Sequence, residues 1–198
     1  MSRRTILVIF AVMIGIGFTA ATALQMKWYP AAIVNGSFIS SREVETRTQA
    51  AARYYEKAAE TYKTELPFSG DVLLQELRRG VLDKLIEDKL VSREVDALLG
   101  GRHEEAVLAK VNGTSFRTSE VEGAVRELYG FSLDEFERAV LVPQAERELL
   151  EDALKKDAKG ENAVRWLEYS RKNASVIMVA HLFTWADGTV QFKEKNSQ

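Results

Sequence analysis

Residues 69–101 read SGDVLLQELRRGVLDKLIEDKLVSREVDALLGG, and this stretch decides the fold. Its apolar residues recur at spacings of three and four, which predicts one long helix from Asp71 to Leu99. Gly100-Gly101 supplies the stop signal. The apolar stripe is wide, so the helix needs neighbours on more than one side and should be the spine of the domain. The residues expected to be buried along it are Leu77, Leu82, Leu85 and Ile86.

The segment before this helix predicts a hairpin and a second helix. Residues 31–40 read AAIVNGSFIS, a short strand, an Asn35-Gly36 turn and a second extended piece. Ser40 and Glu43 have the spacing of a capping box, so a helix should follow and run to about Glu65. Val111-Asn112-Gly113 repeats the hairpin sequence, which predicts another strand, turn and capped helix over residues 108–122.

The segment after the spine predicts helices followed by strands. Ser132 and Glu135 fit a capping box, and Pro143 should kink or restart the helix that follows. A short helix is expected over 162–172, then a strand over 175–184 and a hairpin around Asp187-Gly188. The strand is too apolar to stay exposed and β-hairpins are weak alone. We therefore expect Ala32–Asn35 to pair with Val176–Val179, and Trp166 to pack on the spine.

The amino terminus predicts a membrane anchor. Residues 5–24 are twenty residues without a charge, a length that spans about 30 Å as a helix. Arg3 and Arg4 place the start inside the cell, and Lys27-Trp28-Tyr29 fits the outer interface. The alternative is a signal peptide cleaved near Ala23, since Ala21-Thr22-Ala23 has the A-x-A pattern. Both interpretations place the remainder outside the cytoplasm.

Composition excludes several classes of function. The chain has 198 residues, with 27 basic and 29 acidic residues, so it lacks the basic excess of a nucleic-acid-binding protein. It has no cysteine and two histidines, and no nucleotide-binding or hydrolase motif, so no cofactor, metal or catalytic site is predicted. His103 is expected at a loop or helix start and His181 within a strand. The acidic cluster that begins at Glu146 is interpreted as a solvated helix face.

The aromatic residues are the best candidates for a binding surface. Each of them is explained most simply as part of the core, but several flank loops, where core residues are less expected. An apolar patch bordered by charged helices would bind extended polypeptide. The candidate polypeptide-binding residues are Tyr54, Tyr55, Tyr62, Phe68, Tyr129, Phe131 and Phe136.

Several stretches, taken in order, resemble the SurA-type chaperone domains shared by SurA, PpiD and PrsA. They are Val34–Val44, Val81–Val91 with Arg93-Glu94, Tyr129–Phe136 with Arg147–Leu150, and Ala163–Val176. The resemblance implies a mainly α-helical chaperone domain with a small β-sheet, which binds non-native or extended polypeptide. In that family a parvulin-type isomerase module sits between the last two stretches. Only about ten residues separate the two helices here, so the resemblance implies a domain without the module.

The sequence therefore predicts a membrane-anchored, extracytoplasmic, ATP-independent chaperone-like domain that is not an enzyme. Its expected partners are unfolded or extended polypeptide and, through residues 5–24, the membrane. Two alternatives stay open: an envelope adaptor that docks one folded partner, and a residual peptidyl-prolyl isomerase. The expected organisation is an anchor over 1–29, a SurA-like chaperone domain over 30–192 and a flexible tail over 193–198.

Overall fold

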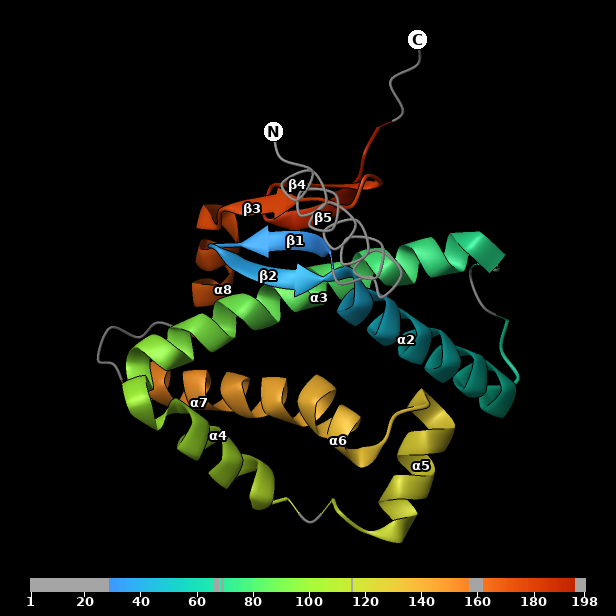
Figure 1. The fold of residues 1–198 in the computed structure, drawn as a ribbon, viewed down its shortest axis with the longest axis horizontal. Coiled ribbons are helices and arrows are strands. Elements are labelled where there is room, and N and C mark those ends of the chain that lie inside the picture. The colour runs from blue at the N-terminus through green and yellow to red at the C-terminus, as the bar shows by residue number, and fades with distance from the viewer. Residues whose placement is uncertain (1–28, 66–67, 69, 115, 157–161, 195–198) are drawn as a thin grey trace, which may run out of the picture.

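The computed structural model describes residues 29–65, 68, 70–114, 116–156 and 162–194 (Figure 1). The predicted membrane segment, residues 5–24, lies outside these residues, as does most of the predicted tail. Among the described residues no helix is both long enough and apolar enough to cross a bilayer. The described chain is mainly α-helical and has two small sheets, which agrees with the predicted fold class.

The hairpin at the start of the described chain forms as predicted. β1 (Pro30–Val34) and β2 (Ser37–Ser40) pair antiparallel. Asn35 and Gly36 connect them with positive φ angles of 47° and 87°. A two-residue type I′ turn requires this left-handed conformation, which explains the Asn-Gly pair.

The carboxyl-terminal part of the chain closes the fold on this hairpin. β3 (Val176–Met178) pairs antiparallel with the free side of β1, with Ala32 opposite Met178 and Val34 opposite Val176. The amide of Asn35 continues the ladder by donating to the carbonyl of Ser175 over 2.8 Å. The predicted closure is therefore confirmed.

Two long helices pack next to the sheet. α2 (Ser41–Tyr62) begins where the capping signal predicted, because the Ser40 hydroxyl accepts a hydrogen bond from the Glu43 amide over 3.1 Å. It ends earlier than Glu65 because Lys63 turns left-handed, with φ 52°. α3 (Gly70–Leu99) is the predicted spine.

The middle of α3 is the centre of the core. Leu82, Leu85 and Ile86 are each at most 1% exposed, as predicted. Leu77 is only part-buried, because it lines a cleft described below. Trp166 is 9% exposed in the same core, which confirms its predicted packing on the spine. The other buried apolar residues of this core are Ala31, Ala32, Val34, Ile39, Val44, Leu90, Val91, Val95, Leu150, Leu154, Phe183 and Val190.

The prediction of a strand and a turn around Asn112 is wrong. A 3-10 turn (Gly100–Arg102) leads into α4 (His103–Asn112), which stays helical through that segment. Val107 and Val111 lie one helical turn apart and are buried together, so burial favours the helix over the strand. The same short motif thus forms a turn in one place and a helix end in the other.

The capped helix predicted after that motif does form. α5 (Ser119–Tyr129) is capped by Thr118, whose hydroxyl accepts from the Val121 amide over 3.3 Å. It ends at Gly130, which has φ 73°. A left-handed residue at this position is typical of a helix end and favours glycine.

A helical run with a π-helical turn follows. α6 (Leu133–Phe136) starts at the predicted capping box, in which Ser132 and Glu135 bond each other in both directions. A π-helical turn (Glu137–Leu141) separates α6 from α7 (Val142–Lys156). The helix therefore restarts next to Pro143, as predicted.

Pro143 also explains an interaction between helices. It has no amide hydrogen to donate to the Ala139 carbonyl four residues earlier. The Arg47 guanidinium from α2 donates to that carbonyl instead, over 3.0 Å. Arg47 also pairs with Asp88 on α3 at 3.3 Å, so one side chain links three helical segments.

The predicted strand over residues 175–184 is divided into two. α8 (Ala163–Asn173) leads into β3, and the chain then turns before β4 (Phe183–Ala186) and β5 (Thr189–Phe192). The amides of Val179 and Ala180 both donate to the Ala31 carbonyl, which ends the ladder with β1. His181 consequently lies exposed in a turn rather than in a strand.

An ion network holds the β4–β5 hairpin and α8 against α3. Arg171 donates to both carboxylate oxygens of Asp83 at 2.6 Å and to Glu87 at 3.1 Å. It also donates to the Gly188 carbonyl over 2.8 Å, and Asp83 accepts from the Val190 amide. The carboxyl-terminal hairpin is therefore part of the packed domain.

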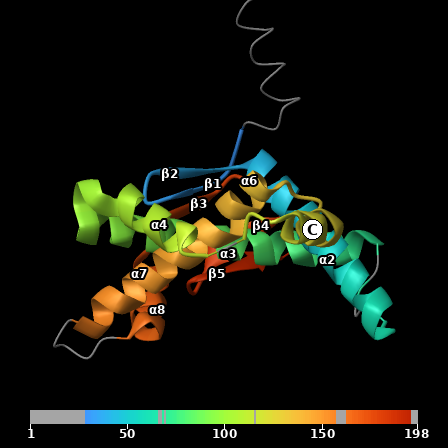
Figure 2. The same cartoon turned by 90° about the horizontal axis from the view of Figure 1, so that it is seen from below.

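In space, α3 runs through the centre of the molecule. Figure 1 shows the strands above α3, and α7 and α4 below it. α2 and α3 lie close together near the sheet and diverge toward the segment that connects them. In Figure 2, β1 and β2 form the upper side of the molecule, and α8 lies at its lower edge.

Candidate functional site

The candidate aromatic residues fall into two groups rather than into one groove. Tyr55 and Phe68 line a cleft between α2 and α3. The second group, Tyr54, Tyr129, Phe131 and Phe136, packs together where α2, the end of α5 and α6 meet. Tyr62, the last residue of α2, is 76% exposed.

The cleft between α2 and α3 encloses about 440 Å³. Its walls are mostly apolar. The apolar and glycine residues that line it are Ala51, Tyr55, Phe68, Leu73, Leu77, Gly80 and Val81. Tyr55 is 48% and Phe68 44% exposed, so both rings can be reached from solvent. Val72 and Leu74, on the first turns of α3, are also exposed, so apolar surface extends along this end of the helix.

The charged residues at the cleft are already paired. Glu76 accepts from the Arg79 guanidinium at 3.0 Å, and Lys84 pairs with Asp88 and Glu87. Among the described residues, each charged side chain that lines the cleft therefore has a partner of opposite charge. An apolar client segment can cover such a surface without removing an unpaired ion from water. A charged segment would lose its own hydration and gain no free partner, so the cleft favours an apolar segment.

The second aromatic group is part of the packed structure. The rings of Tyr54 and Tyr129 stack with centroids 5.4 Å apart and planes at 3°, and Phe136 lies 5.7 Å from Tyr129. Phe131 is 6% exposed, so it is a core residue. Burial raises the pKa of the Tyr129 hydroxyl above its ordinary value, with a smaller contribution from Tyr54. Of this group, Tyr54 is the residue that stays substantially exposed, at 40%.

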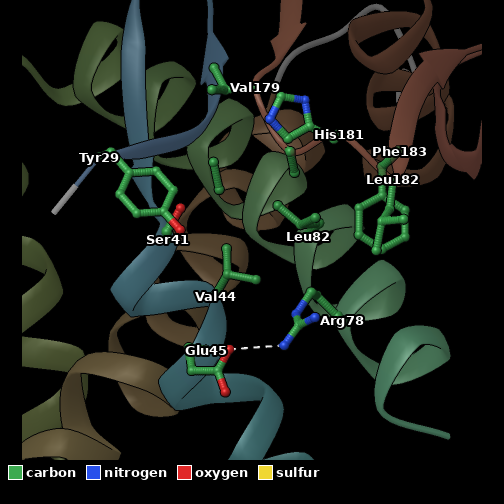
Figure 3. A pocket seen from close by; sticks show the side chains of 12 residues that line it. Tyr29, Ser41, Val44, Glu45, Arg78, Leu82, Val179, His181, Leu182 and Phe183 are labelled. Carbon is green, nitrogen blue, oxygen red and sulfur yellow. Dashed lines mark hydrogen bonds and ion pairs between the residues drawn. The ribbon is translucent and has the colours of Figure 1, made fainter. Parts of the chain in front are cut away.

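A larger hollow of about 540 Å³ lies on the other side of the α2–α3 contact and shares no lining residue with the cleft. Figure 3 shows Tyr29, Val179 and His181 at one end of it, and the ion pair between Arg78 and Glu45 at the other. That ion pair, at 2.9 Å, joins α3 to α2. The hollow is thus bounded by the start of β1 and by the turn between β3 and β4.

Glu146 is not on a solvated helix face, as the sequence suggested, but is 7% exposed. Its carboxylate accepts from the Ser92 hydroxyl at 2.8 Å and lies 3.0 Å from His103 Nε2. The Ser92 hydroxyl points to the carboxylate rather than to the imidazole, so these groups do not form a nucleophile–base pair. They join α3, α4 and α7. Among the described residues, no group of three or more acidic or histidine side chains could hold a metal ion.

Sequence reasoning found the aromatic part of the cleft but missed its aliphatic wall. Leu73 and Leu77 both fall within the predicted spine helix, and the periodicity of its apolar residues cannot distinguish a cleft wall from a core face. Gly80 was an available signal, because glycine inside a helix lowers helix stability and needs another explanation. A Cβ at that position would meet no atom within 4 Å, so Gly80 borders open space.

Comparison with known families matches residues 3–99 to the SurA-like N-terminal domain. The matched region contains β1, β2 and the two helices that line the cleft, α2 and α3. It also includes the apolar run at residues 5–24. No curated protein and no solved structure gives a significant match. A parvulin isomerase domain was not found in the comparison. Only residues 157–162 connect α7 to α8, so no such module is inserted at that place.

Proposed function

The chain belongs to the SurA-like family through residues 3–99, and on that premise we propose that it is a chaperone-like protein that holds non-native or extended polypeptide in the α2–α3 cleft. The observation that carries the proposal is the cleft itself. Its walls are apolar, its rim charges are paired, and two of its aromatic rings are exposed.

The size of the cleft supports side-chain capture rather than engulfment of a folded partner. A volume of about 440 Å³ accommodates a few apolar side chains of an extended segment. Burying one such side chain contributes about 1.5–3 kcal/mol. Binding of that strength is weak for each site and does not depend on a particular client sequence. The sequence holds no nucleotide-binding motif, so client release follows from weak binding rather than from ATP hydrolysis.

We place this activity outside the cytoplasm, with residues 5–24 as an uncleaved anchor. The length of the uncharged run and the two preceding arginines support this orientation. Mass spectrometry of the mature protein, with extraction of membranes at alkaline pH, tests the anchor. An intact amino terminus in the membrane pellet is expected. A new terminus near Leu24 in the soluble fraction would show instead that the segment is a cleaved leader.

The test of the proposed function is suppression of aggregation for several unrelated unfolded clients, measured by light scattering. The double variant Phe68→Ser/Val72→Ser removes exposed apolar groups from the cleft and its margin. The matched control Val164→Ser/Tyr169→Ser removes one aromatic and one aliphatic side chain from α8 that are more exposed than Phe68 and Val72. We expect the first variant to lose suppression and the control to keep it.

Other outcomes would favour the alternatives. One stoichiometric folded partner, recovered without broad suppression of aggregation, would indicate an adaptor. Turnover of an X-Pro peptide would indicate an isomerase. Equal suppression of aggregation by both double variants would show that clients do not bind in the cleft.

A further inference from the structure

The outer face of the three-stranded sheet carries apolar side chains where a solvated sheet would carry polar ones. The inner face is regular: Ala32, Val34 and Ile39 are buried at 1% exposure or less. On the outer face Phe38 is 65% and Ile177 58% exposed. An antiparallel sheet with one face in water normally alternates apolar and polar residues. This sheet is apolar on both faces.

The outer apolar residues lie side by side. Ile33 on β1 pairs directly with Phe38 on β2 and with Ile177 on β3, so the three side chains form a row across the sheet. Val179 follows Ile177 by two positions and is 39% exposed. Leu182 and Tyr29 add exposed apolar area at the neighbouring hollow. Contiguous exposed apolar surface of this kind marks an interaction site.

The same region contains no formal charge. Residues 30–41 and 174–186, which include β1, β2, β3 and β4, contain no Asp, Glu, Lys or Arg, although charged residues make up 28% of the chain. A partner that covers this face therefore does not have to desolvate an ion. A charged or phosphorylated partner would find no ionic side chain within these two segments.

The position of this face in the chain identifies its partner. The apolar run ends at Leu24, and β1 begins at Pro30. The five residues from 25 to 29 span at most roughly 17 Å when fully extended. The polar headgroup layer adds roughly 5–8 Å to each side of the bilayer core. A short tether therefore keeps the sheet close to the membrane surface if residues 5–24 form the proposed anchor.

We propose that the outer face of the sheet, with Phe38, Ile33, Ile177 and Val179, rests on the lipid bilayer and orients the domain on the membrane. This inference rests on the proposed anchor and goes beyond it, because an anchor alone leaves the orientation of the domain open. The sheet edges are short, four residues in β2 and three in β3, which disfavours pairing of edges between two copies. With the sheet against the membrane, α8 and the far end of α2 face away from it (Figure 2).

Because the chain has no cysteine, single labels can be placed without background. The full chain is reconstituted into phosphatidylcholine vesicles with a fluorophore on Phe38→Cys or Ile177→Cys. The matched controls are Tyr62→Cys and Val164→Cys, which lie on α2 and α8 at positions at least as exposed as 38 and 177. Spin-labelled lipid headgroups in the vesicles report proximity by quenching. We expect at least twofold stronger quenching at positions 38 and 177 than at the two controls.

Equal quenching at all four positions, in protein that resists alkaline extraction, would overturn the orientation and leave the anchor standing. Protein that is extracted at alkaline pH would overturn both the anchor and the orientation. Fluorescence at position 38 that ignores the lipid label but changes with the number of chains per vesicle would assign the face to a second copy.

Discussion

Replacing Gly80 by leucine should block the cleft without removing any contact of the folded protein. Gly80 lies in the interior of α3, lines the cleft, and has no atom within 4 Å of the place that a Cβ would occupy. Leucine is a good helix former, so the exchange should stabilise the helix by about 0.7 kcal/mol. In a domain of this size that raises Tm by about 2 °C.

The same leucine should weaken client binding. Excluding one client side chain from the cleft forfeits about 1.5–3 kcal/mol of apolar burial. The Kd for an unfolded client should therefore rise roughly 10- to 150-fold. Fluorescence anisotropy of a labelled, permanently unfolded client measures the Kd, and calorimetry measures Tm.

The matched control is Gly123→Leu. Gly123 is also exposed in a helix, α5, and a Cβ there also meets no atom within 4 Å. This variant should gain similar stability and keep the client Kd of the wild type. If Gly80→Leu raises Tm but binds clients as tightly as Gly123→Leu, the reasoning that places clients in the cleft is refuted.

Leu85→Ala should lower the free energy of unfolding by about 2–5 kcal/mol in denaturant titration, because Leu85 is 1% exposed; a loss below about 0.5 kcal/mol would show that this face of α3 is not core. Arg47→Ala should cost about 1–3 kcal/mol, since it leaves the Ala139 carbonyl without its donor. Pro143→Ala restores an amide donor and should recover part of that loss in a double-mutant cycle, whereas strictly additive effects would contradict this explanation. Deleting residues 175–198 removes β3 and the buried hairpin, so circular dichroism should show loss of the cooperative melt, and a retained melt would make the segment an appendage.

Local signals in the sequence predicted much of the fold. The Asn35-Gly36 turn, the Ser40 and Ser132 caps and the α3 periodicity each act within a few residues, so each could be read directly. The pairing of β1 with β3 could be anticipated because two short apolar segments each lacked a partner. The predictions that failed depend on distant contacts.

Contacts between distant parts of the chain decided two segments whose structure the sequence predicts wrongly. Val111-Asn112-Gly113 repeats the hairpin motif but ends a helix, because Val107 and Val111 share a helical face that packs in one buried cluster with Ala145 of α7. The strand expected over residues 175–184 bends because the Ala31 carbonyl accepts two successive amides. Neither contact is visible in a single sequence.

The candidate site was predicted in part. Tyr55 and Phe68 line the cleft, whereas Phe131 is core and Tyr129 packs among other rings. Aromatic residues are equally suited to the wall of a cleft and to a packed core, so residue type alone could not show which of these residues lie in which place. The separation depends on which rings lie between α2 and α3 and which pack between α2 and α5, and only the folded arrangement gives this.

Site-specific photo-crosslinking tests the central claim most directly. A photoreactive phenylalanine analogue replaces Tyr55 in the cleft or Tyr169 on α8, and each protein is irradiated with an unfolded client. The two positions are 48% and 68% exposed, so solvent access alone favours position 169. The account predicts a client adduct at position 55 and none above background at position 169. An adduct of equal or greater yield at position 169 would contradict it.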